Sequence, residues 1–382
     1  ELAEQDLVAN PQEIEDTRLG GGPLPSSIPG TGLTPPFISS CGEIIQSGNY
    51  TLTSDISGQE VCLYIHDTEN VNLDCQNHIV NSFSPQNSEL MFGAINMKNV
   101  KNFSIKNCKL ESRYRLGPHY TLTSFELHDS NFGVIQNNEI GGGHVNVGNS
   151  GNLEIKDNIF NAPYQQNLSS FNKIHNNRFQ IKNYSTGDAA GVIISNQGHD
   201  NSIQNNSVDG SWDGIDHQAY NFEQYHGSDD GIIISDESND IVSGNTITSN
   251  WDCGIETVGF VKDSQFINNR INNSGVCGIG AWYWNSWLGN TIESNIINGA
   301  AYMFYMFRVY GLNQYSNEQI IYFKNNTFRN NQFLNQRATS FVGATSAYSA
   351  SINFENLPSD LTPEQIQLGN NLFIDNDMGE NL

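Results

Sequence analysis

The sequence predicts an all-β fold, a solenoid of the parallel β-helix type, on the basis of two repeated patterns and the composition. The first pattern is an apolar residue, two further positions, Asn, one position and a second apolar residue. It recurs nine times in order, with its Asn at Asn138, Asn158, Asn177, Asn206, Asn245, Asn269, Asn290, Asn326 and Asn371. Successive Asn residues lie 20, 19, 29, 39, 24, 21, 36 and 45 positions apart. The short intervals predict one rung of a solenoid each, and the long ones predict rungs with insertions.

The apolar residues around each Asn predict strands rather than helices. They alternate with polar residues and are largely β-branched, and they never recur at the helical spacing of i, i+3, i+4 and i+7. Asn at a fixed corner can adopt the left-handed conformation and bond the neighbouring backbone. Stacked corner Asn residues would form a ladder along the axis at the inter-strand spacing of about 4.8 Å. An earlier copy of the pattern has Cys108 in place of Asn.

The second pattern is a Gly that precedes Ile or Val and follows a small or polar residue. It occurs at Gly191, Gly214, Gly231, Gly254 and Gly278. Three of these Gly residues lie 8 or 9 positions after a corner Asn, so the two patterns share one register. On these repeats, residues 41–375 resemble the right-handed parallel β-helix proteins of the pectin-lyase-like superfamily. The resemblance implies a right-handed, single-stranded parallel β-helix and specifies no enzyme family.

The repeats divide the chain into two parts. Residues 1–36 lack the repeat and are acidic, then rich in Gly and Pro, which predicts a flexible N-terminal segment. Residues 37–382 are predicted to form one β-helix domain. Inserted loops are expected in that domain near 217–229, 300–320 and 336–362. The chain begins at Glu1 rather than Met, as an exported chain does after processing.

The composition excludes several classes of function. The 382 residues include 17 Lys and Arg against 41 Asp and Glu, a net charge of −24 at neutral pH. Such a chain is repelled by nucleic acids and anionic membranes, and no apolar run is long enough to span a bilayer. A hydrophobic fraction of 37% is too high for a disordered chain. Neither a nucleic acid nor a membrane is therefore expected as a partner.

The six Cys residues include no C-x-x-C pair, which argues against zinc ribbons and thioredoxin-like chemistry. Cys41 and Cys62 are the preferred candidates for a disulfide. Cys253 and Cys277 occupy equivalent positions in consecutive rungs, where either a disulfide or an inward stack of thiols fits. An acidic chain with disulfides is expected to be secreted or extracellular, including at the cell surface.

The candidate catalytic residues are carboxylates around the longest early interval, between Asn206 and Asn245. They are Asp216, Asp229, Asp230, Asp252 and Glu256. With each Ile after Gly pointing inward, alternation places residues two before and two after Gly on the outer face. Equivalent side chains would lie about 5 Å apart in adjacent rungs and about 10 Å apart in alternate rungs. These spacings bracket those of the paired carboxylates in retaining and inverting glycosidases, and crowding raises one pKa, as a general acid requires.

Four other interpretations of these residues stay open. Asp213 and Asp230 precede Gly and could simply shape turns. The carboxylates could instead bind Ca²⁺ through their oxygen atoms. His217 and His226 could be ordinary loop residues, and the acidic face could be plain solvated surface.

Aromatic residues accompany the carboxylates, because all five Trp residues lie between positions 212 and 287. Trp287 fits a core position. The others exceed what a thin solenoid can bury, and exposed aromatic rings beside carboxylates are typical of sugar-binding sites. The predicted substrate-binding residues are Trp212, His217, His226, Trp282, Trp284 and Arg308.

These observations favour a secreted glycoside hydrolase that acts on a neutral or weakly charged polysaccharide, by inversion, without a cofactor. One alternative is a Ca²⁺-dependent polysaccharide lyase or epimerase assisted by Arg270 or Lys262. Another is a non-catalytic glycan-binding or surface-adhesion β-helix. Asp229-Asp230 resembles the adjacent Asp pair of polygalacturonases, but no Gly-His-Gly or Arg-x-Lys follows. Asp216-His217 likewise departs from the Asp-Pro-His motif of alginate epimerases.

Overall fold

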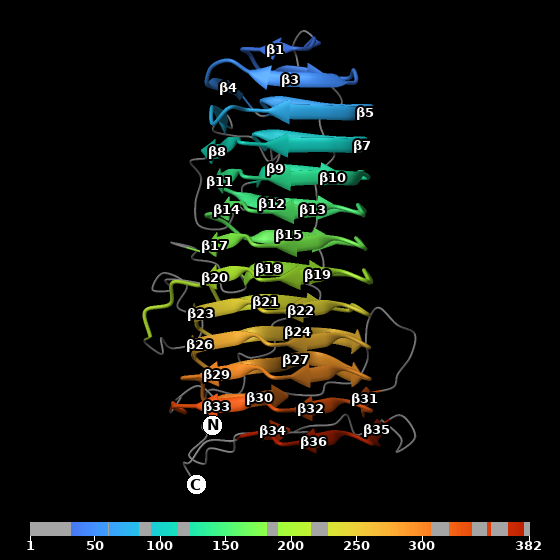
Figure 1. The fold of residues 1–382 in the computed structure, drawn as a ribbon, viewed down its shortest axis with the longest axis vertical. Helices are drawn as coiled ribbons and strands as arrows, with labels where there is room; N and C mark the ends of the chain where they lie inside the picture. Colours follow the sequence, from blue (N-terminus) through green and yellow to red (C-terminus); the bar gives the residue numbers. More distant parts are fainter. Residues whose placement is uncertain are drawn as a thin grey trace, which may run out of the picture.

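The computed structural model describes residues 32–59, 61–83, 93–113, 123–181, 190–214, 228–306, 321–337, 350–352 and 366–377. These residues form strands and turns and contain no α-helix. Every pairing between the described strands is parallel, and the strands stack into a long solenoid with the first rungs at one end and β34 to β36 at the other (Figure 1). No helix in the described ranges has the length and apolarity needed to cross a membrane.

A sheet of 25 strands forms two of the faces of the solenoid, and a sheet of 11 strands forms the third. The strands of the first face are β2 (Gly42–Ile44), β5 (Leu63–Asp74), β7 (Ile95–Lys106), β9 (Thr123–His128), β12 (His144–Gly148), β15 (Tyr164–Asn167), β18 (Ala190–Ser195), β21 (Asp230–Ser235), β24 (Cys253–Lys262), β27 (Cys277–Leu288), β30 (Tyr302–Met306) and β34 (Ala350–Ile352). The long strands β5 and β7 continue around the corner onto the second face.

The second face belongs to the same sheet. Its strands are β1 (Phe37–Ile38), β3 (Gly48–Leu52), β10 (Asn131–Gln136), β13 (Glu154–Lys156), β16 (Lys173–His175), β19 (Ser202–Gln204), β22 (Ile241–Ser243), β25 (Gln265–Ile267), β28 (Thr291–Glu293), β31 (Ile321–Lys324), β32 (Thr327–Arg329), β35 (Ile366–Gly369) and β36 (Leu372–Ile374). Two of these strands, β31 and β35, extend the ladder that starts from the second half of β27.

The third face is the sheet of 11 strands. Its strands are β4 (Ile56–Gln59), β6 (Ile79–Phe83), β8 (Lys109–Arg113), β11 (Glu139–Gly141), β14 (Ile159–Phe160), β17 (Arg178–Gln180), β20 (Ser207–Asp209), β23 (Thr246–Asn250), β26 (Arg270–Ser274), β29 (Ile296–Asn298) and β33 (Gln332–Leu334). The predicted all-β solenoid is therefore confirmed.

The core consists of columns of apolar side chains, one from each rung. On the second face the column passes through Ile135, Ile155, Ile174 and Ile203 in register, and all four side chains are buried. Since side chains alternate along each strand, a two- or three-residue strand contributes one inward residue, and stacking repeats it every rung. The short strands are stable only because each rung covers its neighbour.

Buried Asn side chains form the predicted ladder at the corner between the second and third faces. Asn177 donates from its backbone N–H and its Nδ2 to Asn206 Oδ1, at 2.9 and 3.1 Å. Asn206 repeats the arrangement with Asn245, and its Nδ2 also donates to the carbonyl oxygen of Ile174. Cys108 ends the series, since its N–H donates to Asn138 Oδ1. Each Asn thus satisfies backbone groups of the preceding rungs.

The predicted order of the corner Asn residues is wrong after Asn269. Asn269 stacks on Asn295, and that ladder continues through Asn331. Asn290 belongs to a second ladder at another corner, where it bonds Ser264 and Asn326. The same short pattern of apolar residues flanks both corners, so spacing alone cannot distinguish them.

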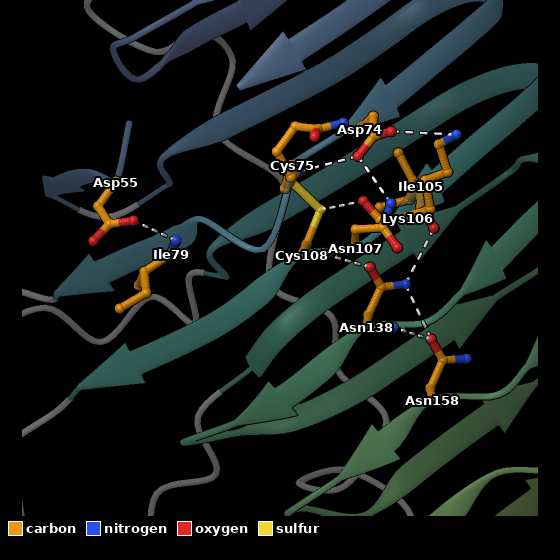
Figure 2. Close-up of a disulfide and its surroundings, with 11 residues drawn as sticks. Asp55, Asp74, Cys75, Ile79, Ile105, Lys106, Asn107, Cys108, Asn138 and Asn158 are labelled. Carbon is orange, nitrogen blue, oxygen red and sulfur yellow. Dashed lines mark hydrogen bonds and ion pairs between the residues drawn. A yellow bond between two sulfur atoms is a disulfide. The ribbon is translucent and has the colours of Figure 1, made fainter. Parts of the chain in front are cut away.

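Three disulfides reinforce the stack, each with Cα atoms 4.5–4.7 Å apart. Cys41–Cys62 is the pair that the sequence favours, and Cys253–Cys277 forms a disulfide rather than a thiol stack. The third, Cys75–Cys108, occupies the position of the Asn ladder in its first rungs, next to Asn138 and Asn158 (Figure 2). Three disulfides are typical of proteins outside the cytoplasm.

The ends of the described ranges refine the predicted boundaries. Leu33 packs in the core and pairs with Glu43, so the β-helix includes residues before the predicted boundary at residue 37. Strands β30 and β34 lie inside two of the ranges predicted as insertions, 300–320 and 336–362. Residues 1–31 and most of the predicted loops lie outside the described residues.

The second ladder contains an acid in place of Asn. Asp240 lies between Asn201 and Ser264, and its Oδ1 accepts the N–H of Asn201 at 2.8 Å. None of the described residues donates to its Oδ2, which is buried. Glu237 lies beside it and accepts hydrogen bonds from Gly198 N–H and Asn201 Nδ2. Burial raises the pKa of both carboxyls, and the charge of Asp240 raises that of Glu237 further, as the charge of Asp200 does for Asp240.

We expect Asn206→Ala to lower the free energy of unfolding by about 2–4 kcal/mol, because it leaves the buried N–H of Asn177 and carbonyl of Ile174 unpaired. Chemical denaturation measures the change. Asn161→Ala, which changes an exposed Asn, is the control and should have little effect. Equal losses for the two variants would contradict the ladder's role.

We expect Asp240→Asn to raise the melting temperature at neutral pH and to flatten its pH dependence. A carboxyl with a raised folded-state pKa stabilises the fold fully below its ordinary pKa near 4, and this stabilisation is lost as pH rises through the raised pKa. The wild type should therefore melt at a lower temperature at about pH 9 than at about pH 5. The exposed Asp157→Asn is the matched control, and an unchanged pH profile in Asp240→Asn would contradict the assignment.

Candidate active site

Acidic side chains of two consecutive rungs meet on the outer side of the first face. Asp230 begins β21, and Asp252 and Glu256 lie in the next rung, just before and within β24. The carboxylate oxygens of these three residues lie within 4.8 Å of one another, and all three side chains are buried. Asp229 is half-buried, and its carbonyl oxygen accepts the N–H of Asp252 at 2.8 Å. Four of the five predicted carboxylates are thus neighbours.

The alternation of β24 directs Glu256 outward, because Ile255 and Thr257 on either side point into the solenoid. Stacked glycines fix the start of each strand. A Cβ on Gly231 would strike the carbonyl oxygen of Gly254 and the side chain of Ile247, so only glycine allows this approach. The Gly pattern of the sequence therefore marks the corner where the third face joins the first.

Backbone hydrogen bonds and a disulfide hold the acidic cluster in place. The N–H of Cys253 donates to Asp230 Oδ1 at 2.9 Å. The carbonyl oxygen of Asp252 accepts the N–H groups of Val276 and Cys277. Because the Cys253–Cys277 disulfide joins the same two rungs, the carboxylates are fixed on three successive strands.

The electrostatics of the cluster single out Glu256. Burial raises its pKa well above the ordinary value, and the charges of Asp230, Asp252 and Asp229 and a hydrogen bond with Asp230 raise it further. Burial and the neighbouring charges thus favour the protonated form of Glu256. A carboxyl group that holds its proton beside other carboxyl groups is what general acid–base chemistry needs.

The predicted position of Asp216 does not fit the register of the rungs. The residue paired with Glu256 in the preceding rung is Ile233, and Gly231 rather than Gly214 belongs to the stack of glycines. Asp216 itself lies outside the described residues, as do His217, His226 and Arg308. The intervals between Asn residues show that this rung contains an insertion. They do not show that the strand of the rung begins after the insertion, at Gly231, rather than at Gly214.

Trp212 has a different environment from the one expected of a sugar-binding residue. It is buried and packs against Trp251 in a small apolar cluster of its own. The guanidinium of Arg337 lies 4.4 Å from the centre of its ring, a cation–π contact. Both contacts leave little of the ring for a ligand.

The remaining Trp residues lie in β27. Trp287 is a core residue as expected, stacked on Phe266 and Phe328, and its Nε1 donates to Thr257 Oγ1 at 2.7 Å. Trp282 and Trp284 belong to the same strand, but their side chains lie outside the described part of the structure.

The cations considered for lyase chemistry lie away from the acidic cluster. Arg270 is exposed on β26, which belongs to the other sheet. Lys262 is at the far end of β24 from the cluster and pairs with Asp263 at 3.6 Å. The strands therefore carry both side chains away from Glu256.

The acidic cluster is also the described group best suited to a divalent cation. Asp230, Asp252 and Glu256 each offer an oxygen within 4.8 Å of the others. The sulfur atoms of Cys253 and Cys277 are not available as ligands, because they form the disulfide. Ca²⁺ takes six to eight oxygen ligands, so further ligands would have to come from elsewhere.

Sequence reasoning missed the buried pair Glu237 and Asp240. Asp240 occupies the position of an Asn in the second ladder, and this position is the signal that could identify it. The sequence pattern does not separate the second ladder from the first, so the signal is hidden. Another pair, Glu126 and His128, lies on β9 with its oxygen and nitrogen 3.0 Å apart, in a rung that carries no Asp-Gly signal.

Known proteins resemble the chain in fold. The family described as right handed beta helix region matches residues 216–333. The Dettilon tailspike protein is 14% identical, with a TM-score of 0.50, over 85% of this chain and 62% of that one. The A-module of the Azotobacter vinelandii mannuronan C-5 epimerase AlgE4 is 13% identical, with a TM-score of 0.46, over 87% and 86%. No curated protein matches the chain.

An exopolygalacturonase from Thermotoga maritima is 12% identical, with a TM-score of 0.40, over 78% of this chain and 79% of that one. A shared fold does not by itself select a reaction. Identities this low show the fold alone. The chain has the fold of a right-handed parallel β-helix protein, and the family model covers residues 216–333 of it.

Proposed function

We propose that the protein is a secreted glycoside hydrolase for a neutral or weakly charged polysaccharide. The observation that carries the proposal is the cluster of Asp230, Asp252 and Glu256, three buried carboxyl groups whose oxygens lie within 4.8 Å. Glycoside hydrolysis by most such enzymes requires one protonated and one ionised carboxyl group at the scissile bond. The raised pKa of Glu256 favours a protonated group in the cluster, and the other two carboxyl groups are the candidates for the ionised one.

Glu256 is the general acid of the proposal. Its raised pKa keeps its proton at neutral pH, and it can pass that proton to the oxygen of the leaving sugar. Asp230 and Asp252 are the candidates for the ionised partner. Asp230 accepts the N–H of Cys253, and this hydrogen bond favours its charged form.

The separation of the carboxyl groups bears on the stereochemistry. In retaining enzymes the two groups are about 5–5.5 Å apart, and in inverting enzymes about 6.5–9.5 Å, which leaves room for water. Oxygens within 4.8 Å favour retention for a pair drawn from the three buried residues. Inversion, which the sequence favours, would require a more distant base, and half-buried Asp229 is the described candidate.

The charge of the protein restricts the substrate. The net charge is −24, and the reacting groups are themselves acidic, so a polyuronate would be repelled. Lys262 and Arg270, the cations considered for neutralising a uronate, lie elsewhere on the solenoid. A neutral or weakly charged glycan meets no such penalty.

A Ca²⁺-dependent lyase or epimerase is the second candidate, because the same three carboxylates could bind the ion. Its chemistry differs in observable products. Elimination creates an unsaturated sugar that absorbs ultraviolet light, whereas hydrolysis releases only reducing ends.

We expect Asp252→Asn, Asp230→Asn and Glu256→Gln to identify the acid–base pair. The two that form it should each lose about 10²–10⁴-fold in turnover, because positioned proton transfer is lost, while glycan binding survives. Release of reducing ends from a panel of neutral polysaccharides measures turnover. The amides should also raise the melting temperature slightly, since they relieve repulsion among the carboxylates.

Glu139→Gln, an exposed carboxylate on the third face, is the control for that series. Loss of activity with chelator, partly restored by Ca²⁺ and joined to lower stability in several variants, would favour the metal site. Full activity in all three variants would place the active site elsewhere.

We expect kcat/KM to fall as pH rises through the raised pKa of Glu256, because the general acid must keep its proton. The group is active below that pKa, so the fall belongs at a pH well above the ordinary pKa of Glu. Initial rates across pH measure it. A profile that falls instead between about pH 4 and 5, the range of an ordinary Glu, would exclude this role.

A further inference from the structure

One corner of the solenoid, between the first and second faces, has a column of residues in the left-handed conformation. The column lies where the first face meets the second, within β5, β7 and β10 and on the turns that join β12 to β13, β15 to β16 and β18 to β19 in Figure 1. Its members in successive rungs are Asn70, Asn102, Phe132, Asn152, Phe171, Asp200, Asn239 and Asp263. Asn and Asp adopt this conformation readily, and Phe does not. Two Phe residues therefore stand where the fold favours short polar side chains.

These Phe side chains do not contribute to the core. Phe132 is 58% exposed and Phe171 is 50% exposed, at φ angles of 59° and 60°. Leu168, on the adjoining turn of the same rung as Phe171, is 56% exposed at a φ of 50°. Strained backbone conformations cluster at active and ligand-binding sites. Burial in the core does not explain these residues, because all three side chains are at least half exposed.

The Phe171 ring is also held in place. The rings of His199 and Phe171 pack edge to face, with the ring centres 5.0 Å apart and the planes at 87°. His199 Nδ1 is 2.7 Å from Asp200 Oδ2, which fixes the imidazole in turn. Exposed Asn152 lies in the rung between the two Phe residues. The column thus presents ring, amide and ring at regular steps.

We propose that Phe132, Asn152 and Phe171 form a second glycan-binding site, which holds a linear neutral polysaccharide along the axis of the solenoid. Two rungs separate the rings, about 10 Å at the usual strand spacing. The C–H groups on one face of a pyranose ring pack on the negative face of an aromatic ring. The amide between the rings can exchange hydrogen bonds with sugar hydroxyls. A polymer that repeats an apolar face and a hydroxylated edge matches this alternation.

Other occupants fit the column less well. A protein partner would need an interface of about 1,200–2,000 Å² with an apolar centre. The column does not offer such a centre, because the amide of Asn152 separates the two rings. An anionic glycan would meet Asp200 and a net charge of −24. The column at Phe171 is three rungs from β24, so it is distinct from the acidic cluster. The proposal does not depend on catalysis there.

The test replaces both rings with the residue that the same column uses in other rungs, in the double variant Phe132→Asn/Phe171→Asn. Asn accepts the left-handed backbone, so the fold should hold, as circular dichroism and the melting temperature report. Binding is measured by affinity electrophoresis in gels that contain galactomannan, xylan or hydroxyethylcellulose, with polygalacturonate for comparison. Phe37→Asn removes a 69% exposed ring on β1 and is the control.

We expect at least one neutral polysaccharide to retard the wild type and the control, and the double variant to bind it at least tenfold more weakly. Equal retardation of wild type and double variant, or no retardation of the wild type by any neutral polysaccharide, would overturn the proposal. So would self-association of the wild type in sedimentation that the double variant loses while retardation stays unchanged.

The same gels run with Glu256→Gln separate this site from the proposed hydrolase. If that variant is retarded in a Phe-dependent way, the second site stands whether or not the wild type releases reducing ends. Loss of turnover in Glu256→Gln with no effect of the Phe variants on binding would support the hydrolase and reject the second site.

Discussion

The stacked, buried Asn side chains are the interaction on which the rest of the structure depends. An Asn such as Asn206 accepts two hydrogen bonds from the rung before it and donates to the rung after it and to a carbonyl oxygen. A solenoid corner exposes backbone groups that strand pairing cannot satisfy, and leaving them buried without partners is costly. The Asn ladders satisfy these groups with one residue per rung. They therefore allow strands of two or three residues to turn a corner inside an apolar core.

Fixed corners have a second consequence, which is that equivalent side chains of neighbouring rungs are held at the strand spacing. This repetition normally produces columns of like residues, as the Ile135 and Ile155 column shows. A column of carboxylates is different, because like charges at this spacing repel. Asp230, Asp252 and Glu256 are kept together by the backbone and by the Cys253–Cys277 disulfide, and burial together with their repulsion raises the pKa of Glu256.

The sequence predicts the fold well because the determinants of the fold are local and repeated. Period-two alternation, corner Asn and Gly before Ile identify strands and corners without knowledge of distant contacts. The register is less predictable. Two corners carry the same short pattern, so Asn290 is mistaken for the successor of Asn269 in place of Asn295. The insertion after Gly214 likewise makes Asp216 look equivalent to Glu256, a position that Ile233 occupies. Pairing over 20 or more residues decides such positions.

The two groups of buried acids show why burial alone does not identify an active site. Asp240 and Glu237 have raised pKa values, yet both side chains point to an inner corner, where Asn201 and Gly198 donate to them. The acidic cluster around Glu256 lies on the outer side of the first face, beside half-buried Asp229. The same desolvation thus has a different consequence in each place. Inside the ladder the raised pKa values lower stability as pH rises, and on the outer face the raised pKa of Glu256 favours a proton on the group that we propose as the general acid.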